Sequence, residues 1–285
     1  MSDWTSGDVN SNGIRIHYTR TGGHKPVLVL AHGATDSGLC WTRLARELES
    51  DYDVIMPDAR GHGLSEAPDS GYSSADHAAD LAGVISGLGL ERPAVGGHSM
   101  GAGTTMRVAA DYPELLSCAI LEDPGIRLDD GPSAGAQDPR AVIRKNVEVA
   151  QTEGREAAIT RGRGVNPTWS EEEFGPWSEA KARVSRQFLD ALTGGGRMLE
   201  WRELLPRLRC PVLLVTSDPE RGGIVTPEAA AEAKRLLPSL EVVRLTGAGH
   251  NIRREQFGAF VAAVRSFLTA NYPSARQPQS ASART

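Results

Sequence analysis

The stretch GGHSMGAG, residues 96–103, places four glycines around one histidine, one serine and one methionine. Inside it, GHSMG (97–101) fits the pattern Gly-x-Ser-x-Gly, between a short apolar strand pattern and a helical one. A serine on a sharp strand-to-helix turn has a strained backbone, and the positions two residues away on each side are too crowded for a Cβ atom. The pattern therefore predicts that Ser99 is exposed for chemistry, with the N–H groups of the next helix aimed at the same point.

Short apolar runs alternate with longer amphipathic segments along most of the chain. Such alternation is typical of βαβ units, so we predict an α/β fold with a mostly parallel sheet and helices on both faces. In these sheets the ligand site lies beyond the carboxyl ends of the strands. We predict strands within 14–19, 27–33, 53–63, 92–97, 117–125, 210–218 and 240–250, and helices at 41–49, 73–88, 100–113, 226–238 and 254–268.

Residues 126–209 break this rhythm. They contain two helical patterns, 139–159 and 179–192, around a turn-rich segment, and no convincing strand. We therefore expect a helical insertion at 126–209 within one core domain, which comprises residues 1–125 and 210–270. The polar end, 271–285, is expected to be a disordered tail.

Composition narrows the classes of protein further. The 285 residues are 40% hydrophobic and 24% charged, with a net charge of −5, which is typical of a globular protein that does not bind nucleic acid. The start of the chain lacks a signal-peptide pattern, and no apolar run is long enough to span a membrane. The three scattered cysteines favour the reducing cytoplasm over a disulfide framework. We expect a cytoplasmic monomer or homodimer that does not bind a membrane.

Serine is a weak nucleophile unless a base accepts its proton and an acid orients that base. His250 lies in LTGAGHN, after the last predicted strand and before the last predicted helix. Asp218 ends the strand CPVLLVTSD. Ser99, Asp218 and His250 thus follow three different strands at the same edge of the predicted sheet.

Five stretches occur together in one order: AHGATDSGLCW (31–41), DARGHGLS (58–65), GHSMG, LLVTSDPE (213–220) and GAGHN (247–251). In this combination the sequence resembles a serine hydrolase of the α/β-hydrolase fold, of the esterase or lactonase type with a helical cap. The resemblance covers nearly the whole chain outside the insertion, which corresponds to the cap.

The resemblance implies a role for each residue. Ser99 would be the nucleophile, His250 the general base and acid, and Asp218 the orienting acid. Some members of the family place the acid after an earlier strand, where Asp123 stands here, so Asp123 is the alternative. The N–H groups of Ala34 and Met100 would form the oxyanion hole.

Other residues are weaker candidates for the substrate pocket. Trp169 and Trp177 of the insertion could line it or form the core of the cap, and the second role is favoured. His32, Asp36 and Asp123 are further candidates. The histidines show no metal-binding spacing, so we expect neither a metal nor a cofactor.

The expected reaction is hydrolysis of a carboxylic ester or lactone, possible examples being a macrolide or an acyl-homoserine lactone. Three alternatives stay open for a chain with this triad. They are a carbon–carbon bond hydrolase, a cofactor-free haloperoxidase, and a ligand receptor that retains the triad.

Overall fold

The computed structural model describes residues 4–128, 139–193 and 199–272, so most of the tail expected to be disordered lies outside the described residues. One eight-stranded sheet has the order β1-β2-β4-β3-β5-β6-β7-β8, with β2 antiparallel to both its neighbours and all other pairs parallel. The strands are β1 (Thr5–Ser11), β2 (Ile14–Arg20), β3 (Val27–Ala31), β4 (Asp53–Pro57), β5 (Ala94–His98), β6 (Cys118–Glu122), β7 (Val212–Thr216) and β8 (Glu241–Arg244).

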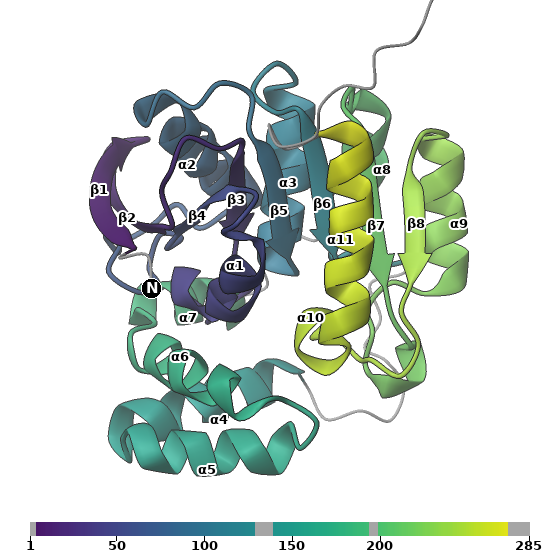
Figure 1. Cartoon of the computed structure of the whole chain (residues 1–285). Coiled ribbons are helices and arrows are strands. Elements are labelled where there is room, and N and C mark those ends of the chain that lie inside the picture. Colours follow the sequence, from purple (N-terminus) through teal and green to yellow (C-terminus); the bar gives the residue numbers. More distant parts are fainter. Residues whose placement is uncertain (1–3, 129–138, 194–198, 273–285) are drawn as a thin grey trace, which may run out of the picture.

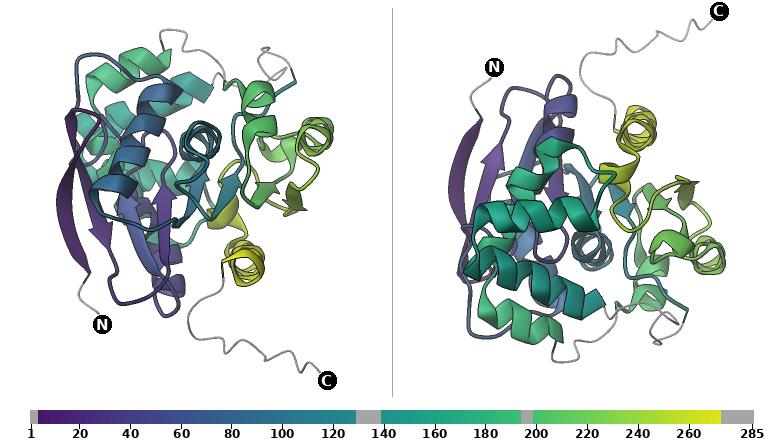
Figure 2. Two further views of the ribbon diagram at one scale, coloured as in Figure 1. Left: turned by 90° about the horizontal axis from the view of Figure 1, so that it is seen from above. Right: turned by 90° about the horizontal axis from the view of Figure 1, so that it is seen from below.

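Helices cover both faces of this sheet (Figures 1 and 2). Helices α2, α3, α8 and α9 pack on one face, and α1, α10 and α11 pack on the other. The central strands β4, β5, β6 and β7 are buried at every residue, as expected for parallel strands covered on both sides. These helices are α1 (Thr42–Leu48), α2 (Ser74–Gly87), α3 (Met100–Asp111), α8 (Trp201–Leu204), α9 (Pro227–Leu236), α10 (Ile252–Glu255) and α11 (Phe257–Asn271), with 3-10 turns at Gly38–Trp41, Leu205–Arg207 and Pro219–Arg221.

In its described part, the insertion between β6 and β7 contains helices joined by turns and no strand. It comprises α4 (Pro139–Thr152), α5 (Arg155–Val165), α6 (Glu171–Ala182) and α7 (Arg186–Thr193). These helices lie below the sheet in Figure 1 and in front of its end in the right-hand view of Figure 2. They therefore cover the edge of the sheet where the sequence places the candidate site, and we call them the cap.

Three details of the sequence-based prediction were wrong. The helix expected at 179–192 is divided between the end of α6 and α7, and in the break the N–H of Ser185 donates to Gly61 O of the core. The helix expected at 139–159 is divided, because Gly154 has a φ of 86° and separates α4 from α5. Strand β1 was not predicted, because its residues TSGDVNS are almost all polar or glycine; its place comes from a seven-residue antiparallel pairing with β2.

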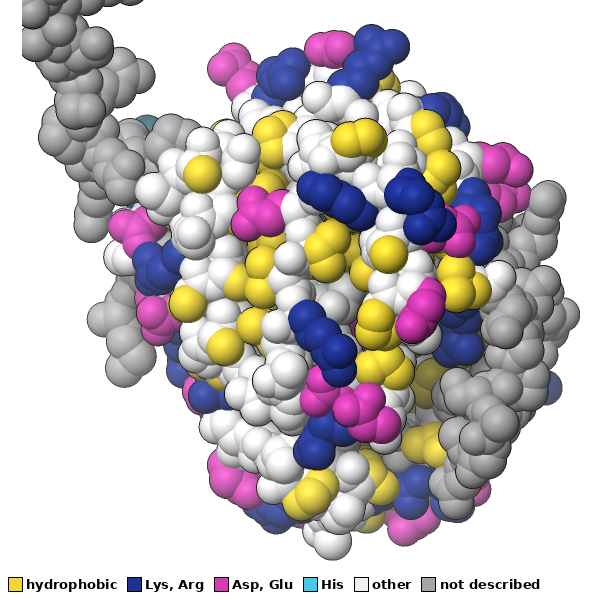
Figure 3. Space-filling model, turned by 90° about the vertical axis from the view of Figure 1, so that its right-hand side faces the viewer, with side chains coloured by type: hydrophobic (Ala, Val, Ile, Leu, Met, Phe, Trp, Pro, Cys, Tyr) yellow, Lys and Arg dark blue, Asp and Glu magenta, His cyan; other side chains and the backbone are white. Residues whose placement is uncertain are grey.

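One face of the molecule mixes apolar and charged side chains (Figure 3). On the face shown in Figure 3, basic and acidic side chains both lie among hydrophobic ones. None of the helices within the described residues is both long and apolar enough to cross a bilayer.

Candidate active site

Ser99 lies at the turn between β5 and α3, in a backbone conformation that a non-glycine residue rarely adopts. Its φ and ψ are 52° and −111°, and its N–H donates to Glu122 O at 2.9 Å. A Cβ added at Gly97 would come within 2.3 Å of the Gly101 carbonyl, and one added at Gly101 would come within 2.1 Å of Ala31 O. The two glycines are therefore required by the close approach of three backbone segments around the serine.

His250 lies in the loop between β8 and α10 and is half-buried. Its Nδ1 donates to Asp123 Oδ2 at 2.7 Å. Because a carboxylate can only accept, this bond places the ring proton on Nδ1 and leaves Nε2 free to take up a proton. His98, the neighbour of Ser99, donates from Nε2 to His250 O at 2.9 Å, and the two rings lie 4.7 Å apart. The serine turn and the histidine loop are thereby connected.

His98 supports this connection rather than the chemistry. Burial, together with the nearby His250, holds the pKa of His98 well below its usual range, so its ring is neutral. The hydroxyl of Ser99 makes no hydrogen bond to any of the described residues, and Ser99 lines the cavity described below. A hydrogen bond between the nucleophile and its base is often long or absent without substrate and commonly tightens only when substrate is bound.

Asp123, directly after β6, is completely buried and has a positive φ of 42°. Its carboxylate accepts from the N–H groups of Ile224 and Val225 at 2.9–3.1 Å as well as from His250. Its own N–H donates to Val215 O of the neighbouring strand β7. Three hydrogen bonds from backbone N–H groups to its oxygens, and one from its own N–H to β7, thus hold the carboxylate of Asp123 against the histidine.

The structure does not bring Asp218, the expected orienting acid, to the ring of His250. The carboxylate of Asp218 accepts from Arg244 Nη2 at 2.8 Å and from Gly247 N at 2.7 Å, and its N–H donates to Ala248 O. The backbone donor Gly247 and the guanidinium of Arg244 lower the pKa of Asp218. Asp218 therefore shapes the loop that carries His250, while the alternative residue, Asp123, contacts its ring.

A cavity of about 390 Å³ opens between the cap and the core, and Ser99 lies in its wall. Ala34 and Met100, whose N–H groups are the predicted oxyanion donors, line the same cavity. Helix α7 supplies much of the apolar wall on the cap side. The described residues that line it are Ala34, Tyr72, Ser74, His77, Ser99, Met100, Gly103, Thr104, Gly125, Arg127, Phe188, Ala191, Leu192, Leu199 and Ile224.

None of the five predicted pocket residues lines this cavity. Trp169 and Trp177 pack with Phe174 and Ile159 in the core of the cap, the role that the sequence analysis favoured. Asp123 instead bonds to His250. Each of the five side chains is buried in the interior of the cap or of the core. It therefore is not available to a ligand in the cavity.

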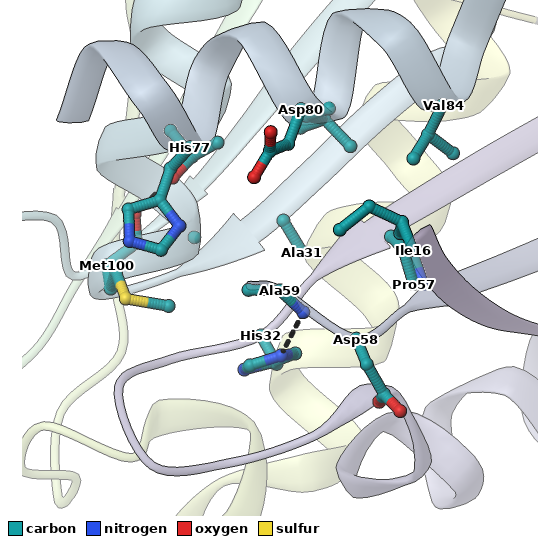
Figure 4. Close-up of a pocket in the computed structure, with 13 residues that line it drawn as sticks. Ile16, Ala31, His32, Pro57, Asp58, Ala59, His77, Asp80, Val84 and Met100 are labelled. Atoms are coloured by element: carbon teal, nitrogen blue, oxygen red, sulfur yellow. Dashed lines mark hydrogen bonds between the residues drawn. The ribbon is translucent and has the colours of Figure 1, made fainter. Parts of the chain in front are cut away.

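His32 belongs to a different, smaller cavity of about 30 Å³, which has room for about one water molecule (Figure 4). Its Nε2 accepts from Ala59 N at 2.9 Å, and its Nδ1 donates to Gly33 O. Burial lowers the pKa of His32, so its ring is neutral. Its two hydrogen bonds hold the loop that precedes Ala34 in place. His77 and Met100 lie at one end of this cavity in Figure 4 and also line the larger one.

Asp36 is part of a buried charged group that joins the cap to the core, and we call this group the seam cluster. Its six members alternate in charge, and each side chain is no more than 5% exposed. Burial would raise the pKa of Asp36, but Arg254, Lys181 and Arg253 outweigh it and hold that pKa well below its usual range. The members are Asp36, Glu122, Glu173, Lys181, Arg253 and Arg254.

The seam cluster also touches the loop of the predicted oxyanion hole. Lys181 Nζ of α6 donates both to Asp36 Oδ1 and to Thr35 O at 2.8 Å. Thr35 has a positive φ of 61°, and its N–H donates to His62 Nε2 at 3.1 Å. The backbone next to Ala34 is thus held from the cap side by a lysine and from the core side by a histidine.

Several cavity residues were not predicted from the sequence. The amphipathic pattern of 179–192 indicated a helix but not which of its residues, among them Phe188 and Leu192, would face the serine. Arg127 follows the strand that carries Asp123, which is the only signal that could have drawn attention to it. Within the described ranges, no three His, Cys, Asp or Glu side chains are grouped so as to hold a metal ion.

The chain belongs to the alpha/beta hydrolase family, whose family model matches residues 28–264. Over 268 residues it is 32% identical to N-formylmaleamate deformylase of Pseudomonas putida, covering 92% of this chain and 96% of that protein. The fold agrees with these matches, since the mostly parallel sheet flanked by helices and the inserted helices are those expected from the sequence.

Two solved structures are also similar. The structure of an N-formylmaleamic acid deformylase from Pseudomonas putida S16 matches with a TM-score of 0.80 and 27% identity, over 91% of this chain and all of that one. A thermophilic esterase from Thermogutta terrifontis, solved with malate bound, matches with a TM-score of 0.72 and 25% identity, over 94% and 99% of the two chains. These similarities include both a deformylase and an esterase.

Proposed function

We propose that the protein is a serine hydrolase that cleaves a small amide or ester through an acyl-enzyme, with Ser99 as nucleophile, His250 as base and Asp123 as the orienting acid. The observation that carries the proposal is the arrangement around one cavity. Ser99 stands at a strained turn in the cavity wall, and His250, bonded to buried Asp123, is joined to that turn through His98. Nucleophile, base and orienting acid are the three parts that acyl transfer requires.

In the first half of the proposed reaction, Ser99 Oγ attacks the substrate carbonyl while His250 Nε2 takes the hydroxyl proton. The carbonyl electrons move to the oxygen, and the resulting oxyanion accepts hydrogen bonds from the N–H groups of Ala34 and Met100. The imidazolium stays paired with the carboxylate of Asp123. When the tetrahedral adduct collapses, His250 returns the proton to the departing nitrogen or oxygen, and the acyl group remains on Ser99.

In the second half, water takes the place of the leaving group. His250 removes a proton from the water, the hydroxide attacks the acyl carbonyl, and the ester bond to Ser99 breaks. The proton passes from Nε2 to Ser99 Oγ, and the free acid leaves. The cycle requires no redox partner, since every step moves only a proton or an acyl group.

The bond that is cleaved was expected to be that of an ester or lactone, and the comparisons broaden this to amides. One relative is named for the deformylation of N-formylmaleamate, and a structural neighbour is an esterase. The comparisons give no support to a macrolactone substrate. The same triad serves amides and esters, but an amide needs protonation of its nitrogen by His250 before it can leave.

The test is a panel of small substrates given to the parent protein and to Ser99→Ala. It contains N-formyl and N-acetyl amides, p-nitrophenyl acetate and butyrate, and an acyl-homoserine lactone. We expect turnover of at least one class, a Ser99→Ala rate lower by about 10³-fold or more, and an acyl adduct on the peptide containing Ser99 by mass spectrometry. Equal rates for the two proteins, or no turnover of any substrate, would contradict the proposal, and the second result would favour the receptor alternative.

A further inference from the structure

Few of the described residues that line the cavity of Ser99 carry a charge. Among these described lining residues, only Arg127 carries a permanent charge, and none is an aspartate or glutamate. His77 is the one other titratable base in the lining, but burial lowers its pKa to about 3, so it is neutral at ordinary pH. The remaining lining is apolar, aromatic or neutral. Within the described part of the wall, one guanidinium therefore supplies the charge that faces the cavity of the nucleophile.

The guanidinium of Arg127 has no hydrogen-bond or ion-pair partner among the described residues. Its backbone, by contrast, is well held: Ile126 is fully buried, and Arg127 O accepts from the indole N–H of buried Trp201 at 3.0 Å. Arg127 itself is half-buried. The main chain of Arg127 is thus anchored, while its guanidinium has no partner among the described residues. Such a guanidinium is available to bind an anion.

A neighbouring arginine shows the difference. Arg107 donates to Ser74 Oγ in the cavity wall, but its charge is already neutralised by Asp111 and Glu200. Arg107 therefore closes the wall without offering a free charge. Arg127 is the lining position at which the positive charge is not balanced by a described acidic residue.

We propose that Arg127 binds a free carboxylate of the substrate, so that the enzyme acts on half-amides or half-esters of small dicarboxylic acids; this inference rests on the proposed function of Ser99. A guanidinium matches a carboxylate with two parallel hydrogen bonds, and its attraction is strengthened in a cavity with apolar walls. The carboxylate would lie at Arg127, and the scissile carbonyl at Ser99 in the same cavity.

The experiment compares one anionic ester with one neutral ester of similar size: p-nitrophenyl hemisuccinate and its methyl ester. In the parent protein we expect a higher kcat/KM for the hemisuccinate. In Arg127→Gln that kcat/KM should fall about 10- to 100-fold, whereas the value for the methyl ester should stay within about threefold. Arg127→Lys keeps the charge but not the planar fork and should lie between the two.

The matched control is Arg163→Gln, which removes one positive charge from the exposed surface of the cap, where Arg163 pairs with Glu171. It should leave both esters unchanged, so a general effect of net charge is excluded. An equal loss for the two esters in Arg127→Gln, or no loss for either, would overturn the assignment of Arg127.

A second measurement does not depend on turnover. Succinate, added to Ser99→Ala, should raise its Tm in a concentration-dependent way, and the double variant Ser99→Ala/Arg127→Gln should show little of this shift. If the parent protein hydrolyses neither these esters nor any substrate of the panel, the proposed function fails, but the succinate shift still tests Arg127. If the esters are hydrolysed and the shift is the same in both variants, only the carboxylate site fails.

Discussion

The core and the cap meet at one cavity but are built on different principles. On the core side, the proposed reacting groups are fixed by backbone hydrogen bonds and close packing, as for Ser99 between Gly97 and Gly101. On the cap side, α7 contributes side chains such as Phe188 and Leu192 as a wall, and the cap is attached through the buried charges of the seam cluster. The difference suggests that chemistry resides in the core, while the cap shapes the space above it.

The largest effect is expected inside the core, where the two aspartates can be compared directly. Asp123→Asn should lower kcat by about 10⁴-fold, because the amide would present N–H to Nδ1 of His250 and favour the wrong tautomer. Asp218→Asn should lower kcat less than about tenfold, since the amide oxygen can still accept from Gly247 N. The measurement is steady-state kinetics on the best substrate of the panel, with circular dichroism to confirm folding. A loss in Asp218→Asn as great as that in Asp123→Asn would show that Asp218 orients the histidine after all.

The next effect concerns the attachment of the cap. Asp36→Asn removes one of three acids that balance three bases in the seam cluster, which leaves an uncompensated buried positive charge. We expect the free energy of unfolding to fall by about 3–5 kcal/mol, measured by urea titration. The surface variant Arg163→Gln should leave the midpoint of the urea transition almost unchanged.

The matching lysine tests whether this loss arises from charge. Lys181→Met removes the partner of Asp36 on α6, and the double variant Asp36→Asn/Lys181→Met removes the pair. If charge balance is the cause, the double variant should be more stable than the sum of the two single losses predicts. Simple additivity would indicate that the seam cluster acts through packing alone.

The smallest expected effect is on the pH dependence of stability. It tests the core rather than the cap, because residues 139–209 contain no histidine. Burial lowers the pKa of His77 to about 3, against 6.5 for the free side chain. Between these values the unfolded chain binds a proton that the folded protein does not, so stability falls as pH decreases from about 6.5 towards 3. His77→Gln should reduce the slope of unfolding free energy against pH by about 1.4 kcal/mol per unit, well below pH 6.5.

Urea titrations between pH 4.5 and 7 would measure this slope. The matched control is His24→Gln, which replaces an exposed histidine. Phe188 of the cap lies 6.4 Å from the His77 ring and 4.1 Å from that of His62, so the cap contributes to their burial. An unchanged slope in His77→Gln would mean that His77 is protonated in the folded protein.

Much of the core could be predicted because its signals are local. An apolar run that ends in glycine indicates a buried parallel strand, and Gly-x-Ser-x-Gly between a strand and a helix indicates the turn at Ser99. The cap was predicted only as a helical insertion. Its breaks depend on single residues such as Gly154, and its contacts with the core lie far apart in the sequence.

The choice between the two aspartates shows where local signals end. Asp123 and Asp218 both follow buried strands at the same edge of the sheet, so the sequence does not distinguish them by position. Their partners differ: the backbone donors of Ile224 and Val225 surround Asp123, whereas Arg244 and Gly247 engage Asp218. These partners come together only after the strands and loops have packed.

The sequence by itself determined the α/β fold, the turn that exposes Ser99, and the histidine of the last strand-to-helix loop, because each depends on the periodicity or steric limits of a few neighbouring residues. The tertiary structure alone decided that Asp123 contacts His250, that Asp36 belongs to the buried seam cluster, and that Arg127, which has no partner among the described residues, lines the cavity of Ser99. Each of these follows from burial and from hydrogen-bond partners up to about two hundred residues away, which no local pattern records.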